Sequence, residues 1–223
     1  MALKFVLAPD SFKGSATASE IAEAMEIGIR RIFTEAEILQ VPMADGGEGS
    51  TEAIVDSTDG EFIYQTVQGP LNDKVEARIG LHGDGETAVI EMATASGLEL
   101  ISKEERNPYK TTTYGTGELI AYCLDQDLKK IILCIGGSAT NDGGVGMAQA
   151  LGYKFEDKDG NEIQRGGIYL KDIVKIDKSN VHPKLMNCEI LIASDVDNPL
   201  TGPEGASTIF GPQKGTTAEM VEE

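Results

Sequence analysis

The sequence predicts an α/β fold, with a parallel sheet in the N-terminal part and a second unit built on a mixed sheet. Two strand and helix units follow one another before residue 58, which is the rhythm of a parallel sheet. Short strands of alternating apolar and polar residues begin at about residue 60. A buried strand, a glycine-rich turn and a helix then occupy residues 131–151, so the strand and helix rhythm returns.

The composition is that of a globular protein of 223 residues, with 40% apolar and 25% charged residues. Thirty-seven acidic and nineteen basic residues leave a formal charge of −18, which disfavours nucleic acid and anionic membrane surfaces as partners. The same charge repels an anionic substrate. A phosphate or carboxylate site must therefore gather lysine, arginine, a metal or helix N-termini locally.

The cysteines indicate a reducing compartment. Cys123, Cys134 and Cys188 are odd in number, widely spaced and embedded in apolar segments, so we expect buried free thiols. The apolar run after Lys4 is too short for a signal peptide, and no stretch approaches the length of a membrane span. We therefore expect a cytoplasmic protein with no membrane partner.

The first unit is a strand over residues 3–8 followed by a helix that opens with a capping box at residues 17–20. The loop between them holds Asp10, Ser11 and Lys13 at the carboxyl end of the strand, where open α/β sheets bind ligands. Lys13 is the only cation of this loop. A solvated lysine and a turn aspartate are the alternatives.

The second unit is a strand over residues 38–41 that leads through a glycine-rich turn into a helix at residues 51–55. The turn contains two carboxylates and two glycines that are candidate ligand contacts: Asp45, Gly46, Gly47 and Glu48. The two carboxylates are close enough in sequence to share a magnesium ion or to cap the helix start. Capping is the simpler interpretation.

Three short alternating segments separated by glycine turns predict antiparallel hairpins: residues 62–67, 75–81 and 88–92. The change of rhythm indicates a domain boundary near residues 58–60. This boundary would separate residues 1–59 from residues 60–223. Because there is no low-complexity linker, the boundary is expected to be closely packed.

Further elements follow along the chain. A helix start rich in hydroxyls and glycines at residues 111–118 is either an anion site or a plain N-cap. Buried strands are expected at residues 130–135 and 189–193. Residues 153–163 are predicted to form a hairpin that turns at residues 159–160.

The glycine-rich stretch, residues 136–144, lies between a strand and a helix that Gly152 is expected to end as a left-handed cap. Its glycines permit positive φ and a close approach of the backbone to a ligand, and the first N–H groups of the next helix form a natural anion site. A tight turn without a ligand is the alternative. The candidate ligand contacts in this stretch are Gly136, Gly137, Ser138, Asn141 and Asp142.

Acidic and amide side chains follow the last strand, at Asp195, Asp197 and Asn198. Their spacing lacks the glycine and the distal glutamate of a calcium loop, which excludes calcium binding of that type. Lys214 supplies a second well-placed cation before a capping-box helix start at residues 216–219. The chain stops within two turns of that start, so we expect a fragment of a longer protein.

The two histidines, His82 and His182, stand beside no serine or cysteine in a pattern that would form a triad. Serine or cysteine hydrolase chemistry therefore has little support. No Walker-type loop and no protein-kinase signature occurs either, so a nucleotide would be bound by another arrangement.

Five motifs together resemble the bacterial glycerate kinase family, the type-1 group. In chain order they are PDSFKG at residues 9–14, PMADGGEG at 42–49, GGSATNDGG at 136–144, SDVDNPL at 194–200 and FGPQKG at 210–215. The resemblance runs along the whole chain. Each motif is moderately specific, and their order and spacing make the set specific.

The resemblance implies ATP-dependent phosphorylation of D-glycerate, with 2-phosphoglycerate favoured as product and ATP and Mg²⁺ as cofactors. It implies a flavodoxin-like parallel-sheet domain into which a second, mixed α/β domain is inserted, with the substrates in the cleft between them. Residues 1–59 would then be the N-terminal part of the first domain, and residues 60–223 would be most of the inserted domain. It also implies longer chains in which C-terminal sequence completes the first domain, which leaves the activity of a 223-residue fragment open.

Phosphoryl transfer needs in-line positioning, cations around the transferring oxygens and a carboxylate near the attacking hydroxyl. We expect Lys13 and Lys214 to supply charge toward phosphate or the glycerate carboxylate. Asp195 is the leading candidate for the catalytic base or the magnesium ligand, with Asp45 and Asp142 as competitors. The site is therefore expected to be composite, with distant lysines meeting the glycine-rich stretch.

Two other functions fit parts of the sequence. Acidic residues after strands also suit a magnesium-dependent phosphatase of small phosphorylated acids, although this function explains none of the motif order. A folded module that only binds an anion is the non-enzymatic alternative. The expected partners are small molecules and a nucleotide, and the sequence does not indicate an oligomeric state.

Overall fold

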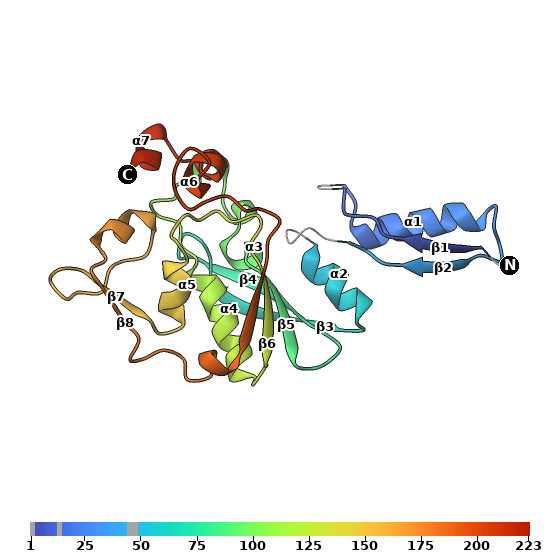
Figure 1. Ribbon diagram of the computed structural model, residues 1–223, viewed down its shortest axis with the longest axis horizontal. Helices are drawn as coiled ribbons and strands as arrows, with labels where there is room; N and C mark the ends of the chain where they lie inside the picture. Colours follow the sequence, from blue (N-terminus) through green and yellow to red (C-terminus); the bar gives the residue numbers. More distant parts are fainter. Residues whose placement is uncertain (1–2, 13–14, 44–48) are drawn as a thin grey trace.

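The computed structural model describes residues 3–12, 15–43 and 49–223. It consists of a small N-terminal unit beside a larger body that is built on a five-stranded sheet (Figure 1). The α/β class predicted from the sequence is confirmed. None of the helices in the described ranges has the length and apolar character needed to cross a bilayer.

The N-terminal unit contains β1 (Lys4–Leu7), α1 (Ala18–Arg30) and β2 (Glu37–Gln40). The two strands pair in parallel, as the repeated strand and helix pattern predicts. The α1 helix begins at the predicted capping box, in which Thr17 accepts a hydrogen bond from the Glu20 N–H and the Glu20 carboxylate accepts one from the Thr17 N–H. This box fixes the direction in which the chain leaves the loop after β1.

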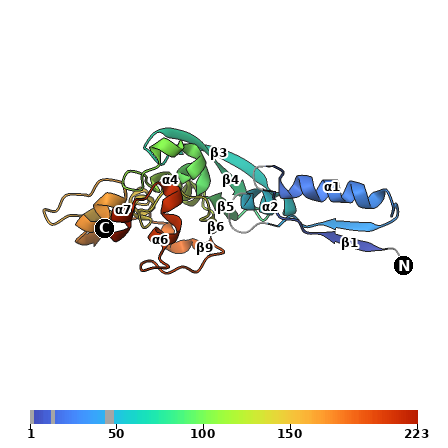
Figure 2. The ribbon, with the colours of Figure 1, turned by 90° about the horizontal axis from the view of Figure 1, so that it is seen from above.

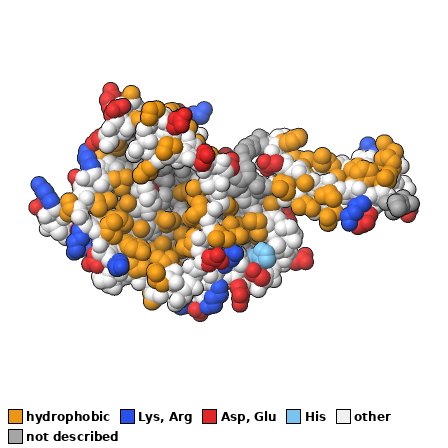
Figure 3. Space-filling view, viewed as in Figure 1, with side chains coloured by type: hydrophobic (Ala, Val, Ile, Leu, Met, Phe, Trp, Pro, Cys, Tyr) orange, Lys and Arg blue, Asp and Glu red, His pale blue; other side chains and the backbone are white. Residues whose placement is uncertain are grey.

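The helix α1 lies along one side of the two-stranded sheet (Figure 2). Apolar side chains of this unit remain exposed, including Val6 on β1 at 58% and Leu39 on β2 at 47%. Hydrophobic side chains accordingly gather over this unit in the space-filling view (Figure 3).

The larger body is built on a sheet with the strand order β3-β4-β5-β6-β9. Its strands are β3 (Glu61–Gln68), β4 (Lys74–Leu81), β5 (Thr87–Glu91), β6 (Lys130–Cys134) and β9 (Glu189–Ala193). The first three pair antiparallel, which confirms the predicted hairpins, and β5, β6 and β9 are parallel. The carboxyl ends of three parallel strands therefore meet at one edge.

Helices cover both faces of this sheet. The α4 helix (Tyr114–Asp125) buries Leu119 and Ile120 in the core together with Ile79 of β4. The α2 helix (Ser50–Ser57) packs on the other face, where the absence of a side chain at Gly80 lets Thr51 approach. The domain division expected from the sequence assigns α2 to the N-terminal unit, but in the structure α2 lies against the larger sheet.

Short helices join the strands. They are α3 (Ala93–Ser96), α5 (Val145–Ala150), α6 (Ala206–Phe210) and α7 (Ala218–Glu222), with 3-10 turns at Leu98–Leu100, Lys103–Glu105, Gly167–Asp172, Leu185–Asn187 and Pro212–Lys214. Gly152 follows α5 with a φ of +93°, which confirms the predicted left-handed cap. The last helix begins within the predicted residues 216–219, but its N-cap is Thr217, which accepts a hydrogen bond from the Met220 N–H, in place of the Thr216 that the predicted capping box requires.

The predicted hairpin at residues 153–163 is only partly right. The turn is present, since Gly160 has a φ of +81° and its N–H donates to the Asp157 carbonyl. However, β7 (Lys154–Glu156) takes β8 (Lys175–Asp177) as its antiparallel partner. The returning chain makes only one isolated bridge, at Glu162, because the turn leaves too few residues for a second strand.

All three cysteines are free thiols, as expected, and Cys123 and Cys134 are buried, whereas Cys188 is only partly buried. Burial raises the pKa of the Cys123 thiol to about 12 and that of the Cys134 thiol to about 11. Both are therefore inert protonated thiols near neutral pH.

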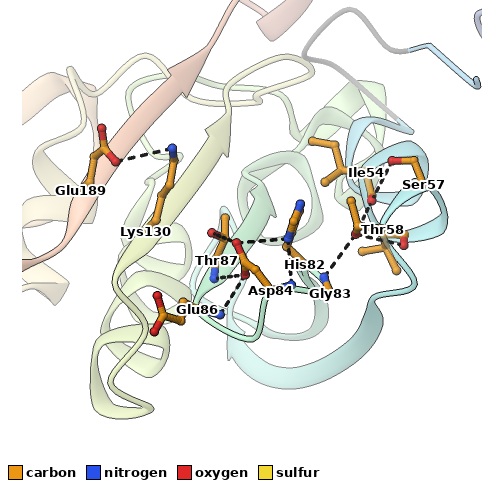
Figure 4. A network of polar contacts seen from close by, with 11 residues as sticks. Ile54, Ser57, Thr58, His82, Gly83, Asp84, Glu86, Thr87, Lys130 and Glu189 are labelled. Atoms are coloured by element: carbon orange, nitrogen blue, oxygen red, sulfur yellow. Dashed lines mark hydrogen bonds and ion pairs between the residues drawn. The ribbon is translucent and has the colours of Figure 1, made fainter.

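The edge of the sheet where β5 begins carries a polar turn (Figure 4). Here the Asp84 carboxylate accepts hydrogen bonds from the Glu86 N–H and from the N–H and hydroxyl of Thr87, while His82 Nδ1 lies 3.2 Å from Asp84. His82 thus belongs to a structural turn at the edge opposite the carboxyl end of β5.

Candidate functional site

The candidate site lies at the edge where β5, β6 and β9 end. Cys134 is in register with Glu91 on one side and with Ala193 on the other. The glycine-rich stretch at residues 136–144 and the acidic stretch that begins at Ser194 therefore leave neighbouring strands at the same edge. Open α/β sheets bind their ligands in this position.

The glycine-rich stretch adopts a backbone that depends on its glycines. Gly137, Gly143 and Gly144 have φ values of +73°, +60° and +74°. The stretch is held from one side, because the Leu98 N–H donates to the Gly137 carbonyl at 2.9 Å and the Ala139 N–H donates to the Ser96 carbonyl at 2.8 Å. The turn is thus a preformed feature of the fold.

Lys214 places its ammonium group on this turn. Its Nζ donates to Ser138 Oγ at 2.6 Å and to the Thr140 carbonyl at 2.8 Å. The sequence expectation that Lys214 meets the glycine-rich stretch is therefore met in the structure, across a separation of 76 residues.

The environment of Lys214 changes its acidity. Burial lowers the pKa of its ammonium group to about 8, and the negative charge of Asp142 opposes this shift. An ammonium group that is partly desolvated and only partly compensated by hydroxyl and carbonyl oxygens can gain a further anionic partner. This is the electrostatic demand of a phosphate or carboxylate site.

Asp142 is buried, at 2% exposure, and is engaged by the protein itself. Its carboxylate accepts hydrogen bonds from the N–H and hydroxyl of Thr113, from the Gly144 N–H and from the Gly146 N–H. The protein's own carboxylate thus occupies the anion position expected at the start of α5. We therefore assign Asp142 to positioning the turn and the starts of α4 and α5, in place of direct contact with a ligand.

Two further hydrogen bonds hold the C-terminal segment, one to the same turn and one to the loop that carries Arg106. Asn141 Nδ2 donates to Ser207 Oγ at 2.8 Å, and Arg106 Nη1 donates to the Gln213 carbonyl at 3.1 Å. Gly215, with a φ of +86°, packs so closely on Arg106 that a Cβ there would lie 2.2 Å from the Arg106 carbonyl oxygen. The position of Lys214 is therefore determined by its loop as well as by its own hydrogen bonds.

The acidic stretch after β9 is open to solvent. Asp195 and Asp197 are exposed, and Asn198 Nδ2 donates to the Glu204 carbonyl at 2.9 Å. Within the described ranges there is no cluster of three or more His, Cys, Asp or Glu side chains suited to a metal. Asp195 offers one accessible carboxylate, and one or two suffice for Mg²⁺ when water and phosphate complete its shell.

The N-terminal candidates divide into two groups. Asp10 is exposed and its carboxylate accepts a hydrogen bond from the Ser11 N–H at 2.6 Å, whereas Ser11 lines the cleft between α1 and α2. The other candidates lie outside the described residues: Lys13, Asp45, Gly46, Gly47 and Glu48. Their expected roles stay predictions.

The sequence did not single out two further charged residues near this edge. Glu91 ends β5, is 5% exposed and accepts a hydrogen bond from the Thr51 N–H at the start of α2. Arg78, in the middle of β4, faces the cleft beside α2. An acidic residue at the carboxyl end of an otherwise buried strand was a usable signal for Glu91, whereas the direction of Arg78 depends on how α2 packs.

The fold and this edge together are typical of α/β proteins that bind small anionic molecules at the carboxyl ends of parallel strands. The family model described as the glycerate kinase family matches residues 5–223, and the chain belongs to this family. The resemblance found in the five sequence motifs is thereby confirmed.

Individual relatives agree with this assignment. A glycerate kinase of Haemophilus influenzae is 56% identical over 221 residues, which cover 99% of this chain and 58% of that protein. A glycerate 2-kinase of Escherichia coli K12 is 54% identical over 221 residues, with the same two coverages. A crystal structure of a candidate glycerate kinase 2 from Salmonella typhimurium LT2 matches with a TM-score of 0.93 and 53% identity, covering 100% of this chain and 59% of that one.

The chain therefore spans 58% of the length of these two curated relatives.

Proposed function

We propose that this chain supplies part of the active site of a kinase that transfers the γ-phosphoryl group of ATP to D-glycerate, with the 2-hydroxyl as acceptor. Membership of the glycerate kinase family supports the substrate, and the name glycerate 2-kinase of the Escherichia coli relative supports the acceptor position. The single observation of the structure that carries the proposal is the contact of Lys214 Nζ with Ser138 in the glycine-rich turn.

The chemistry proposed for this edge is electrostatic. In phosphoryl transfer the protein mainly holds the reactants in line and neutralises charge on the transferring oxygens. The Lys214 ammonium group contributes that charge, and the backbone N–H groups at Gly136 and Gly137 are available to anionic oxygens. Asp195 either accepts the proton of the glycerate hydroxyl or would hold Mg²⁺, which would supply positive charge to the transferring phosphate.

The proposal is tested by a coupled assay of ADP release with D-glycerate, ATP and Mg²⁺, on this chain and on a protein of the length of its curated relatives. Turnover above a control without glycerate is expected for the longer protein. The absence of such turnover would overturn the proposal. Phosphate release from phosphorylated acids without ATP would instead indicate a phosphatase, and ³¹P NMR of the product identifies the hydroxyl that is phosphorylated.

The role of Asp195 has its own test. Asp195→Asn should lower kcat by at least about 100-fold, because proton transfer by a positioned group contributes roughly 10²- to 10⁴-fold. Asp197→Asn is the matched control, since Asp197 is an exposed aspartate two residues away. A change of only a few-fold in Asp195→Asn, with circular dichroism unchanged, would remove Asp195 from the catalytic residues.

Location in the cytoplasm also belongs to this proposal. The three free thiols support a reducing compartment.

A further inference from the structure

A second feature of the molecule is a cleft of about 280 Å³ between the N-terminal unit and the larger sheet. Its walls come from the loop after β1, the start of α1, the start of α2 and the strand β4. Hydroxyl side chains dominate one wall: Ser11, Ser15, Thr17 and Ser19. Such a wall suits a small ligand that carries hydroxyl groups.

Arg78 is the cation among the described residues that line this cleft. Along β4, residues 77 and 79 are buried in the core against α4, so residues 78 and 80 point to the opposite face, where α2 packs. The Arg78 side chain is held there at 29% exposure. It therefore faces the cleft from a rigid central element of the fold.

The guanidinium group of Arg78 is held in place by packing, although its N–H groups make no hydrogen bond to another described residue. Its Cζ lies 4.7 Å from the centroid of the Phe62 ring, and its nearest carboxylate contact is Glu52 at 3.9 Å, which is beyond hydrogen-bond distance. Within the described ranges the guanidinium group donates no hydrogen bond to another residue. Among the described residues, its five N–H donors therefore have no hydrogen-bond acceptor, and a planar acceptor could fill that place.

The acidic residues that line the cleft restrict the positions at which an anion can bind. Glu20 and Glu52 also line it, and Glu20 is tied to the Thr17 N–H in the capping box of α1. In a protein of formal charge −18, Arg78 is the group among the described lining residues whose positive charge stabilises a carboxylate that enters this cleft. A guanidinium group binds a carboxylate through two parallel hydrogen bonds, a geometry that lysine does not offer.

The cleft and the glycine-rich turn are connected through α3. Thr94 Oγ1 donates to the Arg78 carbonyl at 3.4 Å, and a Cβ placed on Gly137 would lie 3.2 Å from the Ala93 Cβ. Neighbouring residues of one short helix therefore touch both Arg78 and the turn that receives Lys214. A small molecule bound at Arg78 lies on the same edge of the sheet as the cation proposed to meet phosphate.

We propose that Arg78 binds the carboxylate of the acid substrate and so sets the preference for a hydroxy acid over an uncharged polyol. This inference rests on the proposed function for the identity of the acid. The two cations then have different roles: Arg78 binds the carboxylate of the substrate, and Lys214 contacts the phosphoryl group.

The test compares Arg78→Gln and Arg78→Lys with the unsubstituted protein, each at the length of the curated relatives. Arg78→Gln should raise the KM for glycerate about 10- to 100-fold, the range expected for the loss of a hydrogen-bonded charge pair. Its KM for ATP should stay within about 2-fold, and the preference for glycerate over glycerol in kcat/KM should fall by the same factor as the glycerate value. Arg78→Lys keeps the charge and should recover part of the loss.

Arg165→Gln is the matched control. Like Arg78, Arg165 stacks on an aromatic ring, with its Cζ 3.3 Å from the centroid of Tyr114. It donates a hydrogen bond to Gln68 and is not among the residues that line the cleft. This variant should leave the KM for glycerate unchanged. Thermal unfolding of all variants checks that they are folded.

Two outcomes would overturn the role of Arg78: an unchanged KM for glycerate in Arg78→Gln, or a rise confined to the KM for ATP. A calorimetric titration with glycerate separates this result from a failure of the proposed function. Glycerate that binds the unsubstituted protein and not Arg78→Gln supports the carboxylate site even if no turnover occurs. Equal binding to both proteins contradicts it.

Discussion

At the scale of single residues, the charge of Lys214 is the property of the site most sensitive to pH. Its pKa is lowered to about 8, so the ammonium group loses its proton as the pH rises through that value. If the positive charge meets an anionic substrate, kcat/KM for glycerate should fall above pH 8. In Lys214→Arg the charge persists to above pH 12, so the fall should disappear from the profile between pH 8 and 10.

The measurement is a pH profile of kcat/KM for both proteins. An identical alkaline fall in Lys214→Arg and in the unsubstituted protein would assign that fall to another group. If Lys214→Arg has no activity, the comparison is made with the binding of inorganic phosphate as a function of pH. Phosphate binding should then weaken above pH 8 in the unsubstituted protein and not in Lys214→Arg.

The loss of the buried Asp142 carboxylate should destabilise the protein. Asp142→Ala leaves the N–H and hydroxyl donors of Thr113 and the N–H groups of Gly144 and Gly146 without their acceptor in a buried position. We expect a loss of about 3 kcal/mol or more in the free energy of unfolding, because each unsatisfied buried donor costs about 1–3 kcal/mol. Asp142→Asn retains one acceptor oxygen and should lose about half as much.

Urea unfolding of the two variants and the unsubstituted protein measures these differences. A midpoint in Asp142→Ala that matches the unsubstituted protein would contradict the assignment of Asp142 to positioning the turn.

At the scale of elements, the close packing of α4 on α5 depends on Gly117. A Cβ at this position would lie 2.3 Å from the Met147 carbonyl oxygen and 2.7 Å from the Ala150 Cβ. Gly117→Ala should therefore destabilise the protein by about 1–3 kcal/mol, as overpacking usually does. It should also disturb the glycine-rich turn, which leads directly into α5.

The matched control is Gly28→Ala in α1. A Cβ added at Gly28 would meet no atom within 4 Å, so only helix propensity changes there. This substitution should stabilise the helix by roughly 1 kcal/mol. Thermal unfolding distinguishes the two, and equal shifts of the same sign in both variants would disprove the role of close packing at Gly117.

The elements were predictable where local periodicity and capping decide them. The strands β1 and β2, the start of α1 at Thr17 and the left-handed residue Gly152 all follow from patterns within a few residues. The partner of β7 was not predictable, because β8 lies beyond a long loop and is itself only three residues long. The face that α2 covers likewise depends on Gly80, whose role appears only when the sheet is assembled.

The same distinction applies to the site. Lys214 and Ser138 were identifiable as residue types next to glycines, and their meeting follows from the order of motifs. The hydrogen bond from Thr113 to Asp142 could not be predicted from the sequence, because it forms only when the starts of α4 and α5 lie side by side in the folded protein. Arg78 shows no sequence signal beyond its place in an alternating strand.

At the scale of the whole molecule, carboxylates with lowered pKa values are spread over the larger body, and they set its response to acid. Hydrogen bonds from the Glu86 backbone and from Thr87 lower the pKa of Asp84 to about 2, and lysines lower the pKa of Glu156. A carboxylate whose folded pKa is depressed stabilises the fold above its unfolded pKa of about 4. This contribution is lost as the pH falls from about 4 through the folded value.

We therefore expect the unfolding temperature to fall as the pH decreases from 4 to 2. Asp84→Asn should lower the unfolding temperature at pH 7 and flatten the fall at acid pH, because asparagine does not titrate. Asp10→Asn, at an exposed position outside the larger body, should leave the fall of the unfolding temperature at acid pH unchanged. If the unfolding temperature falls equally between pH 4 and pH 2 in Asp84→Asn and in the unsubstituted protein, other groups control the acid transition.

The contact between Lys214 and Ser138 also has a consequence for the order in which the protein is made. A ribosome that has completed residue 210 has already produced β5, β6, β9 and the glycine-rich stretch, but none of the loop that carries Lys214. Domains generally begin to fold while synthesis continues. The growing chain therefore contains the glycine-rich stretch before it contains the lysine that is proposed to supply positive charge there.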